Sequence, residues 1–132
     1  MKHQITNKSL DDLKLAIVGL GYVGLPTALA FHSKGFIVHG VDVSEKIVEK
    51  LTLGESHLVD SSASLKIPLD DESWKVSSGF TEAVSSSDVI LITVPTPVNE
   101  DKSPDFSYVE SASRSVLSNL DRGKRNIVVL ES

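Results

Sequence analysis

Apolar residues gather in five short runs along the chain, at residues 14–20, 36–43, 74–78, 88–94 and 126–132. Most of these runs are continuous rather than alternating, which is typical of strands that are buried on both faces. We therefore predict five strands, of which residues 88–94 give the clearest signal.

Two helices in the first half are predicted from apolar spacing and from their end signals. Apolar residues recur at helical spacing from Val23 to Ser33, and Gly35 is suited to end that helix. Ser44 is a favourable N-cap for a second helix, and Gly54 is its expected end.

The second half of the chain continues the alternation of helices and strands less regularly. Residues 55–73 are rich in Ser and Asp and are predicted to be loop with one short helix at most, and a brief helix is predicted near 81–86. Ser107 and Glu110 form a capping box, which predicts a helix reaching about Asn119. Strands that alternate with helices predict an α/β fold, in which right-handed crossovers produce a doubly wound parallel sheet.

Three glycines follow the first predicted strand directly. Gly19, Gly21 and Gly24 form the pattern G-x-G-x-x-G at the opening of the first helix, which in this context indicates a Rossmann-type dinucleotide site. The first glycine permits a tight turn, the second leaves room for a pyrophosphate, and the third lets the helix pack closely on the strand. The N–H groups near Tyr22 and Val23 are then expected to face the anion, with the helix dipole behind them. A simple turn is the alternative interpretation of these glycines.

Asp42 supplies the second half of this pattern. It ends the second predicted strand eighteen positions after Gly24, close to the roughly 20 expected for the carboxylate that binds the adenosine ribose. A carboxylate there repels a 2′-phosphate, and no Arg follows it in the segment 41–46, so NAD is favoured over NADP.

The segment Val94-Pro95-Thr96-Pro97 follows the strand predicted at 88–94. Ligands of open α/β sheets bind outside the carboxyl ends of the strands, and a residue before proline prefers an extended conformation. We expect Val94, Pro95 and Thr96 to form a stiff wall beside the cofactor, with Thr96 as a polar contact. A loop stiffener without a binding role is the alternative.

Composition restricts the remaining possibilities. The chain has 132 residues, 40% of them hydrophobic, a net charge of −5 and no cysteine. The charge argues against nucleic acid or an anionic membrane as a main partner, and a thiol nucleophile and thiolate metal sites are excluded within this chain. The histidines show no metal-ligand spacing, and neither a signal peptide nor a membrane span is expected, so a cytoplasmic location is predicted.

Several segments carry a family resemblance that covers residues 13–132. "KLAIVGLGYVGLPTALAF", "VPTPVNEDKSPDFSYVESA" and the terminal "VVLES" resemble the UDP-glucose/GDP-mannose dehydrogenase family. The pieces "GES" and "VPTPVNEDKSPDFSYVESA" are most similar to its UDP-N-acetyl-D-mannosamine dehydrogenase branch. The resemblance implies an N-terminal extension at residues 1–12 and an NAD-binding domain at 13–132.

The resemblance also implies a reaction. Family members oxidise the 6-hydroxymethyl group of a UDP-sugar or similar nucleotide sugar to a carboxylate with two NAD molecules, through a thiol-bound intermediate. Their catalytic Cys, Lys and Asn lie in downstream domains, so no catalytic residue is expected in this chain, which alone should be inactive. The longer enzyme is expected to be a homodimer.

Site residues follow from the same resemblance. Gly19, Gly21, Tyr22, Val23 and Gly24 would hold the pyrophosphate. Asp42 would hold the adenosine ribose, and Thr96 and Ser132 would line the nicotinamide side. Where many family members have Lys, five residues after the aspartate, this chain has Ile47.

Two other functions share the glycine pattern. One is a regulatory NAD(H)-sensing domain without catalysis, and the other is the cofactor domain of a hydroxyacid dehydrogenase. The double-proline loop favours the nucleotide-sugar enzyme over both.

Overall fold

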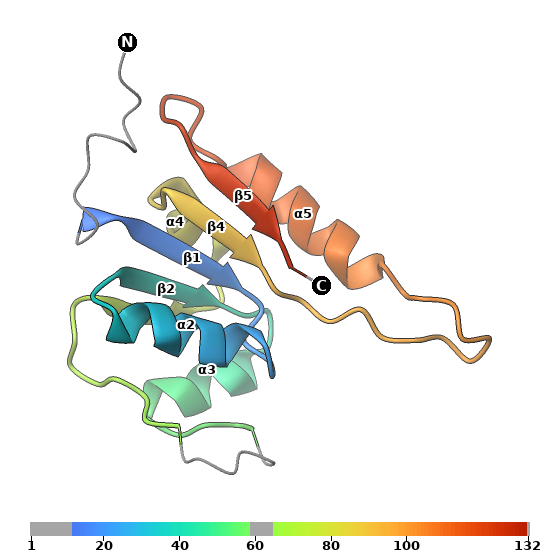
Figure 1. The fold of residues 1–132 in the computed structure, drawn as a ribbon, viewed down its shortest axis with the longest axis horizontal. Helices are drawn as coiled ribbons and strands as arrows, with labels where there is room; N and C mark the ends of the chain where they lie inside the picture. The colour runs from blue at the N-terminus through green and yellow to red at the C-terminus, as the bar shows by residue number, and fades with distance from the viewer. Residues whose placement is uncertain (1–11, 59–64, 132) are drawn as a thin grey trace.

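A computed structural model of the chain describes residues 12–58 and 65–131. Five parallel strands form a single sheet in the order β3-β2-β1-β4-β5 (Figure 1). Their bounds are β1 Lys14–Val18, β2 Ile37–Val41, β3 Trp74–Ser77, β4 Val89–Ile92 and β5 Ile127–Leu130. All five predicted strands are thereby confirmed, each with bounds inside the predicted run.

Helices cover both faces of this sheet. They are α2 Gly24–Ser33, α3 Glu45–Thr52, α4 Phe80–Ser85 and α5 Ser107–Asn119. In Figure 1, α2 and α3 lie in front of the sheet while α4 and α5 lie behind it. This is the doubly wound α/β fold that the sequence predicted.

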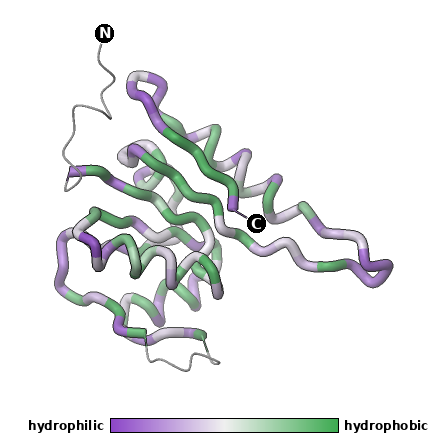
Figure 2. Tube along the Cα trace, in the orientation of Figure 1, coloured by the Kyte–Doolittle hydropathy of each residue, from purple (hydrophilic) through white to green (hydrophobic). Residues whose placement is uncertain are grey.

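Two apolar clusters fill the spaces between sheet and helices. One joins α2 and α3 to the sheet through Leu25, Leu51 and Ile17. The other joins α4 and α5 to the opposite face through Val84, Val116 and Ile90. Because successive side chains of a strand point to opposite faces, the continuous apolar runs of β1 and β4 supply both clusters; these runs appear green in Figure 2.

The prediction that the strands are buried on both faces is wrong for β5. Its four apolar side chains are 39–53% exposed, so this strand is not covered on both faces, although its composition resembles that of β1 and β4. β5 is paired only with β4 and forms the edge of the sheet in the part of the chain that the structure describes.

Helix ends agree with their predicted signals, with one exception. Ser44 accepts a hydrogen bond from the Ile47 N–H at 3.4 Å, and Gly35 and Gly54 both adopt positive φ where their helices end. Within the described parts of 55–73 the chain forms no helix; residues 59–64 lie outside the described residues.

The predicted capping box at Ser107 is the exception. Phe106 is the N-cap and Ser107 is already helical, so no Ser–Glu reciprocal bond forms. Asp105 takes over the capping role, because its carboxylate accepts the Ser107 N–H at 2.9 Å. Hydrogen bonds from the backbone and side chain of Ser107 lower the pKa of Asp105.

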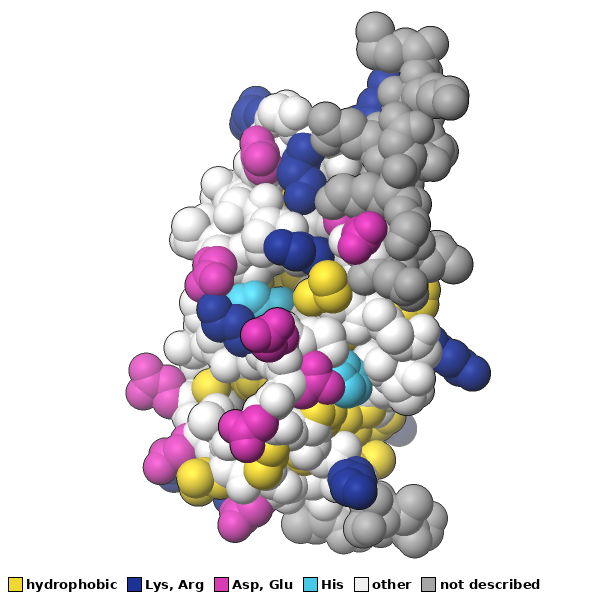
Figure 3. All heavy atoms as spheres, turned by 90° about the vertical axis from the view of Figure 1, so that its left-hand side faces the viewer, with side chains coloured by type: hydrophobic (Ala, Val, Ile, Leu, Met, Phe, Trp, Pro, Cys, Tyr) yellow, Lys and Arg dark blue, Asp and Glu magenta, His cyan; other side chains and the backbone are white. Residues whose placement is uncertain are grey.

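A long loop leads from β4 to α5 and projects from the body of the domain (Figure 1). Its stem is closed by an antiparallel bridge between Val98 and Pro104, and its polar tip is purple in Figure 2. On the side of the molecule shown in Figure 3, acidic and basic side chains lie interspersed. None of the described helices has the length and apolar character needed to cross a membrane.

Candidate functional site

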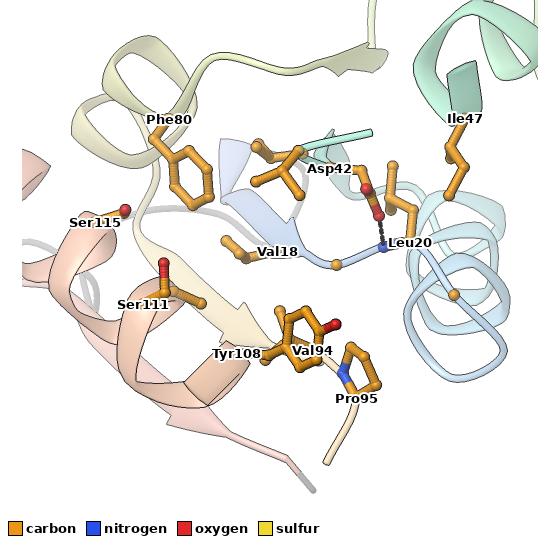
Figure 4. Close-up of a pocket in the computed structure, with 15 residues that line it drawn as sticks. Val18, Leu20, Asp42, Ile47, Phe80, Val94, Pro95, Tyr108, Ser111 and Ser115 are labelled. Atoms are coloured by element: carbon orange, nitrogen blue, oxygen red, sulfur yellow. Dashed lines mark hydrogen bonds between the residues drawn. The ribbon is translucent and has the colours of Figure 1, made fainter. Parts of the chain in front are cut away.

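A cavity of about 320 Å³ opens at the carboxyl ends of the central strands (Figure 4). It lies where α2 and α5, which follow the neighbouring strands β1 and β4, go to opposite faces of the sheet, the place where open α/β sheets bind ligands. The lining residues come from the glycine loop, the end of β2, α3, α4, the loop after β4, and α5: Val18, Gly19, Leu20, Gly21, Val41, Asp42, Val43, Ile47, Phe80, Val94, Pro95, Tyr108, Ser111, Ala112 and Ser115.

Strand register sets the geometry of this end of the sheet. Val18 of β1 pairs with Val41 of β2 and with Ile92 of β4, so the three strands end level. The next residue on each strand is therefore at the same edge: Gly19, Asp42 and Thr93.

The first and third glycines shape the turn from β1 into α2. Gly19 has φ +95°, a conformation that L side chains rarely adopt, and its N–H donates to the Val41 carbonyl at 2.8 Å. A Cβ added at Gly24 would lie 1.7 Å from the Gly19 carbonyl oxygen, so only glycine lets α2 begin this close to the strand. These positions behave as the sequence pattern predicts.

The second glycine faces open space. A Cβ added at Gly21 would meet no atom within 4 Å, although Gly21 lines the cavity. The next two residues, Tyr22 and Val23, are exposed, and within the described residues no acceptor is found for their backbone N–H groups. A free surface with unpaired donors at a helix start is what an anion requires.

Asp42 is held by two backbone donors. One oxygen of its carboxylate accepts the Leu20 N–H at 2.8 Å, drawn as a dashed line in Figure 4, and the other accepts the Ser44 N–H at 2.9 Å. Each carboxylate oxygen can accept a further hydrogen bond. Asp42 is thus fixed in position beside the cavity and can still accept hydrogen bonds from a diol.

Only part of the proline segment at residues 94–97 lines the cavity. Val94 and Pro95 line the cavity, whereas Thr96 is half-buried and is not among the lining residues. Ser132 lies outside the described residues. The structure therefore brings Gly19, Gly21 and Asp42 together with the first half of the predicted wall.

Sequence reasoning missed one whole side of the cavity. Four residues of α5, Tyr108, Ser111, Ala112 and Ser115, line it at spacings of three and four, which place them on one helix face. That spacing was visible in the sequence, but nothing local indicated that this face looks toward the glycine loop. Phe80, the first residue of α4, adds an aromatic ring to the same side (Figure 4).

The side chains that line the cavity suit a ligand with both polar and apolar parts. Most lining side chains are apolar, and Asp42 carries the only charge among them. Among the described residues, the hydroxyl groups that line the cavity are those of Tyr108, Ser111 and Ser115. Backbone donors for a diphosphate, a fixed carboxylate for a ribose and an apolar floor fit a dinucleotide.

Comparisons with known proteins agree with this geometry. The family model described as the UDP-glucose/GDP-mannose dehydrogenase family, NAD binding domain, matches residues 13–132. The chain is 40% identical over 121 residues to the UDP-N-acetyl-D-mannosamine dehydrogenase of Escherichia coli, covering 89% of this chain and 27% of that protein.

Two further relatives share the similarity. The NDP-N-acetyl-D-galactosaminuronic acid dehydrogenase of Ralstonia nicotianae is 37% identical over 126 residues, covering 93% of this chain and 28% of that protein. The solved structure of the UDP-D-ManNAc dehydrogenase from Pyrococcus horikoshii superposes with a TM-score of 0.77 at 35% identity, covering 91% of this chain and 28% of that chain. The chain therefore spans just over a quarter of the length of these relatives.

Proposed function

Because the chain belongs to the UDP-glucose/GDP-mannose dehydrogenase family, as its NAD binding domain, we propose that it serves an NAD-dependent nucleotide-sugar 6-dehydrogenase. In that enzyme a UDP-sugar is oxidised to the uronic acid with two NAD. This chain supplies the cofactor site, at residues 13–132, and residues 1–12 precede it as an extension. We expect the chain by itself to be inactive, because the resemblance places the catalytic Cys, Lys and Asn of the family in downstream domains.

The arrangement of the cofactor follows from the cavity. The diphosphate lies over Gly21, next to the N–H groups of Tyr22 and Val23, for which the described part of the chain offers no acceptor. The adenosine ribose donates its hydroxyls to Asp42. Gly19 and Gly24 shape the loop without contacting the ligand through side chains. The openness at Gly21, beside a carboxylate already fixed by two backbone donors, is the observation that carries this assignment.

The family resemblance assigns the nicotinamide end of the cofactor to the side of Thr96, and the adenine end then lies on the other side of the diphosphate. Phe80, Ser111 and Ser115 lie across the cavity from Leu20 and Ile47 (Figure 4), and we assign adenine to this surface. Val94 and Pro95 line the cavity on the nicotinamide side, and the family resemblance assigns Thr96 and Ser132 to the same side.

We propose UDP-N-acetyl-D-mannosamine as the substrate, because relatives with that name match the chain at 38–40% identity. The sugar site, the catalytic residues and the dimer contacts lie in middle and C-terminal domains of a longer protein, a cytoplasmic homodimer. A regulatory NAD(H)-sensing domain is not favoured, since the relatives are named as dehydrogenases.

Two measurements test the proposal. Titration calorimetry of this chain should show NAD binding, weak because part of the cleft is supplied elsewhere, and weaker binding of NADP. A preference for NADP would contradict the role of Asp42. The longer protein, assayed with a panel of UDP-sugars, should reduce NAD with UDP-N-acetyl-D-mannosamine; turnover of none of the UDP-sugars would overturn the enzymatic assignment.

A further inference from the structure

We propose that Thr93 is the positioning residue of the diphosphate loop: its hydroxyl fixes the peptide group between Gly19 and Leu20. This inference deepens the proposed cofactor site and rests on it. Thr93 does not line the cavity, and no local sequence signal marks it. Its importance arises from where the end of β4 lies in the sheet.

Two side chains hold one peptide group from opposite sides. The Thr93 hydroxyl donates to the Gly19 carbonyl oxygen at 2.8 Å. On the other side, the Leu20 N–H donates to the Asp42 carboxylate at 2.8 Å. The carbonyl and the N–H belong to the same planar, trans peptide unit, so they point in opposite directions. A peptide gripped at both ends cannot rotate without breaking both bonds.

The rotated orientation of this peptide would also be unfavourable. Turning the peptide over would direct the Gly19 carbonyl oxygen toward the Asp42 carboxylate, where two acceptors would face each other. The Leu20 N–H would in turn face the Thr93 side of the loop. The two side chains thus define one orientation of this peptide.

The Thr93 hydroxyl has no substitute at the Gly19 carbonyl. Thr93 is only 6% exposed, and the carbonyl lies so close beneath α2 that a Cβ at Gly24 would approach it to 1.7 Å. Within the described residues no other donor to this oxygen is found. The hydroxyl also lies 3.0 Å from the Val18 carbonyl, but that oxygen already accepts the Thr93 N–H at 2.8 Å. A hydroxyl has a single proton, so its bond to Gly19 is the one that nothing else replaces.

The consequence reaches the diphosphate through the loop. Gly21 and the donors that follow it begin one residue after the fixed peptide, so their direction depends on its orientation. Removing the hydroxyl leaves a buried acceptor unpaired and lets the loop relax. Diphosphate affinity should therefore fall although no ligand contact has been removed.

The experiment compares three variants of this chain. Thr93→Val keeps the shape and removes the hydroxyl, while Thr93→Ser keeps the hydroxyl and removes the methyl group. Ser87→Ala is the matched control, because Ser87 is 1% exposed and its hydroxyl donates to the Ala83 carbonyl at 2.6 Å, at the opposite end of the sheet. Each variant is titrated with ADP-ribose and with adenosine, which lacks the diphosphate. Exchange of the Leu20 amide proton is followed by NMR without ligand.

We expect Thr93→Val to weaken ADP-ribose binding about tenfold, as the loss of one buried hydrogen bond implies, and to change adenosine binding less than about twofold. The Leu20 amide should exchange faster in this variant. Thr93→Ser should restore affinity and slow exchange, and Ser87→Ala should change neither. If Thr93→Val does not fold, Thr93→Cys, whose thiol is a weak donor, should show the same pattern.

Other results would overturn the proposal. Equal losses of ADP-ribose affinity in Thr93→Val and Ser87→Ala would show that Thr93 affects binding only through the stability of the fold. Unchanged Leu20 exchange in Thr93→Val, or no recovery in Thr93→Ser, would do the same. If the unaltered chain binds no ADP-ribose, the cofactor assignment fails, and amide exchange still decides the role of Thr93.

Discussion

Replacing Gly21 by valine should separate binding of the cofactor from stability of the fold. A Cβ at this position meets no atom within 4 Å, and the φ of Gly21 is not in the left-handed region. The side chain therefore fits the folded chain without a clash, and the free energy of unfolding should change by less than about 1 kcal/mol. The added carbons would, however, occupy the space over the loop in which we place the diphosphate.

The size of the binding loss can be worked from the donors involved. Two N–H groups, those of Tyr22 and Val23, have no acceptor among residues 12–58 and 65–131 and would bond to the anion. Charge-assisted bonds contribute about 1.5 kcal/mol or more each, so losing both costs about 3 kcal/mol, on the order of a hundredfold in affinity.

A contrasting variant is available three residues later. A Cβ at Gly24 would have to move from 1.7 Å to at least 3.0 Å from the Gly19 carbonyl oxygen. We therefore expect Gly24→Ala to destabilise the fold by about 1–3 kcal/mol or more. Titration calorimetry with NAD and chemical denaturation measure the two effects separately. Wild-type NAD affinity in a folded Gly21→Val chain would refute the placement of the diphosphate.

Three further predictions concern the carboxylates and one histidine. Asp42→Ser should lower the affinity for NAD and reduce the ratio of NAD affinity to NADP affinity, because the charge that repels a 2′-phosphate is gone. Competition titrations with both cofactors measure this ratio, and an unchanged ratio would contradict the prediction. Asp88 lies at the far end of the sheet and is 2% exposed. Its carboxylate accepts the Lys14 N–H at 3.0 Å and pairs with Lys124 at 3.4 Å. Lys124→Met should lower the free energy of unfolding in denaturant by about 1–3 kcal/mol, because it removes one of the groups that pair with this buried carboxylate, while the affinity of the chain for NAD stays the same. Burial, and next the charge of Lys75, lower the pKa of His39 below its usual 6.5. The unfolded chain then binds the proton first, so His39 contributes a loss of stability as the pH falls from 6.5 toward its lower folded pKa; this loss should vanish in His39→Asn, as thermal unfolding across that range can check.

The local parts of the site could be predicted because their causes are local. Gly19, Gly21 and Gly24 are set by backbone sterics within one turn, and Asp42 lies at a fixed distance along one βαβ unit. Periodicity likewise predicted the five strands and the two layers of helices. The capping box failed at the same scale, since Asp105, two residues earlier, competed successfully for the Ser107 N–H.

Sheet order and register decided the rest. Thr93 bonds to Gly19 across 74 residues because β4 lies beside β1 and both strands end level. The α5 face reaches the cavity only because the crossover from β4 to β5 places that helix behind the same edge. Such contacts depend on which strands are neighbours, and periodicity within one strand or helix carries no information about that. The sequence alone determined what kinds of groups surround a dinucleotide, and the tertiary structure determined which side chain holds the loop in place for it.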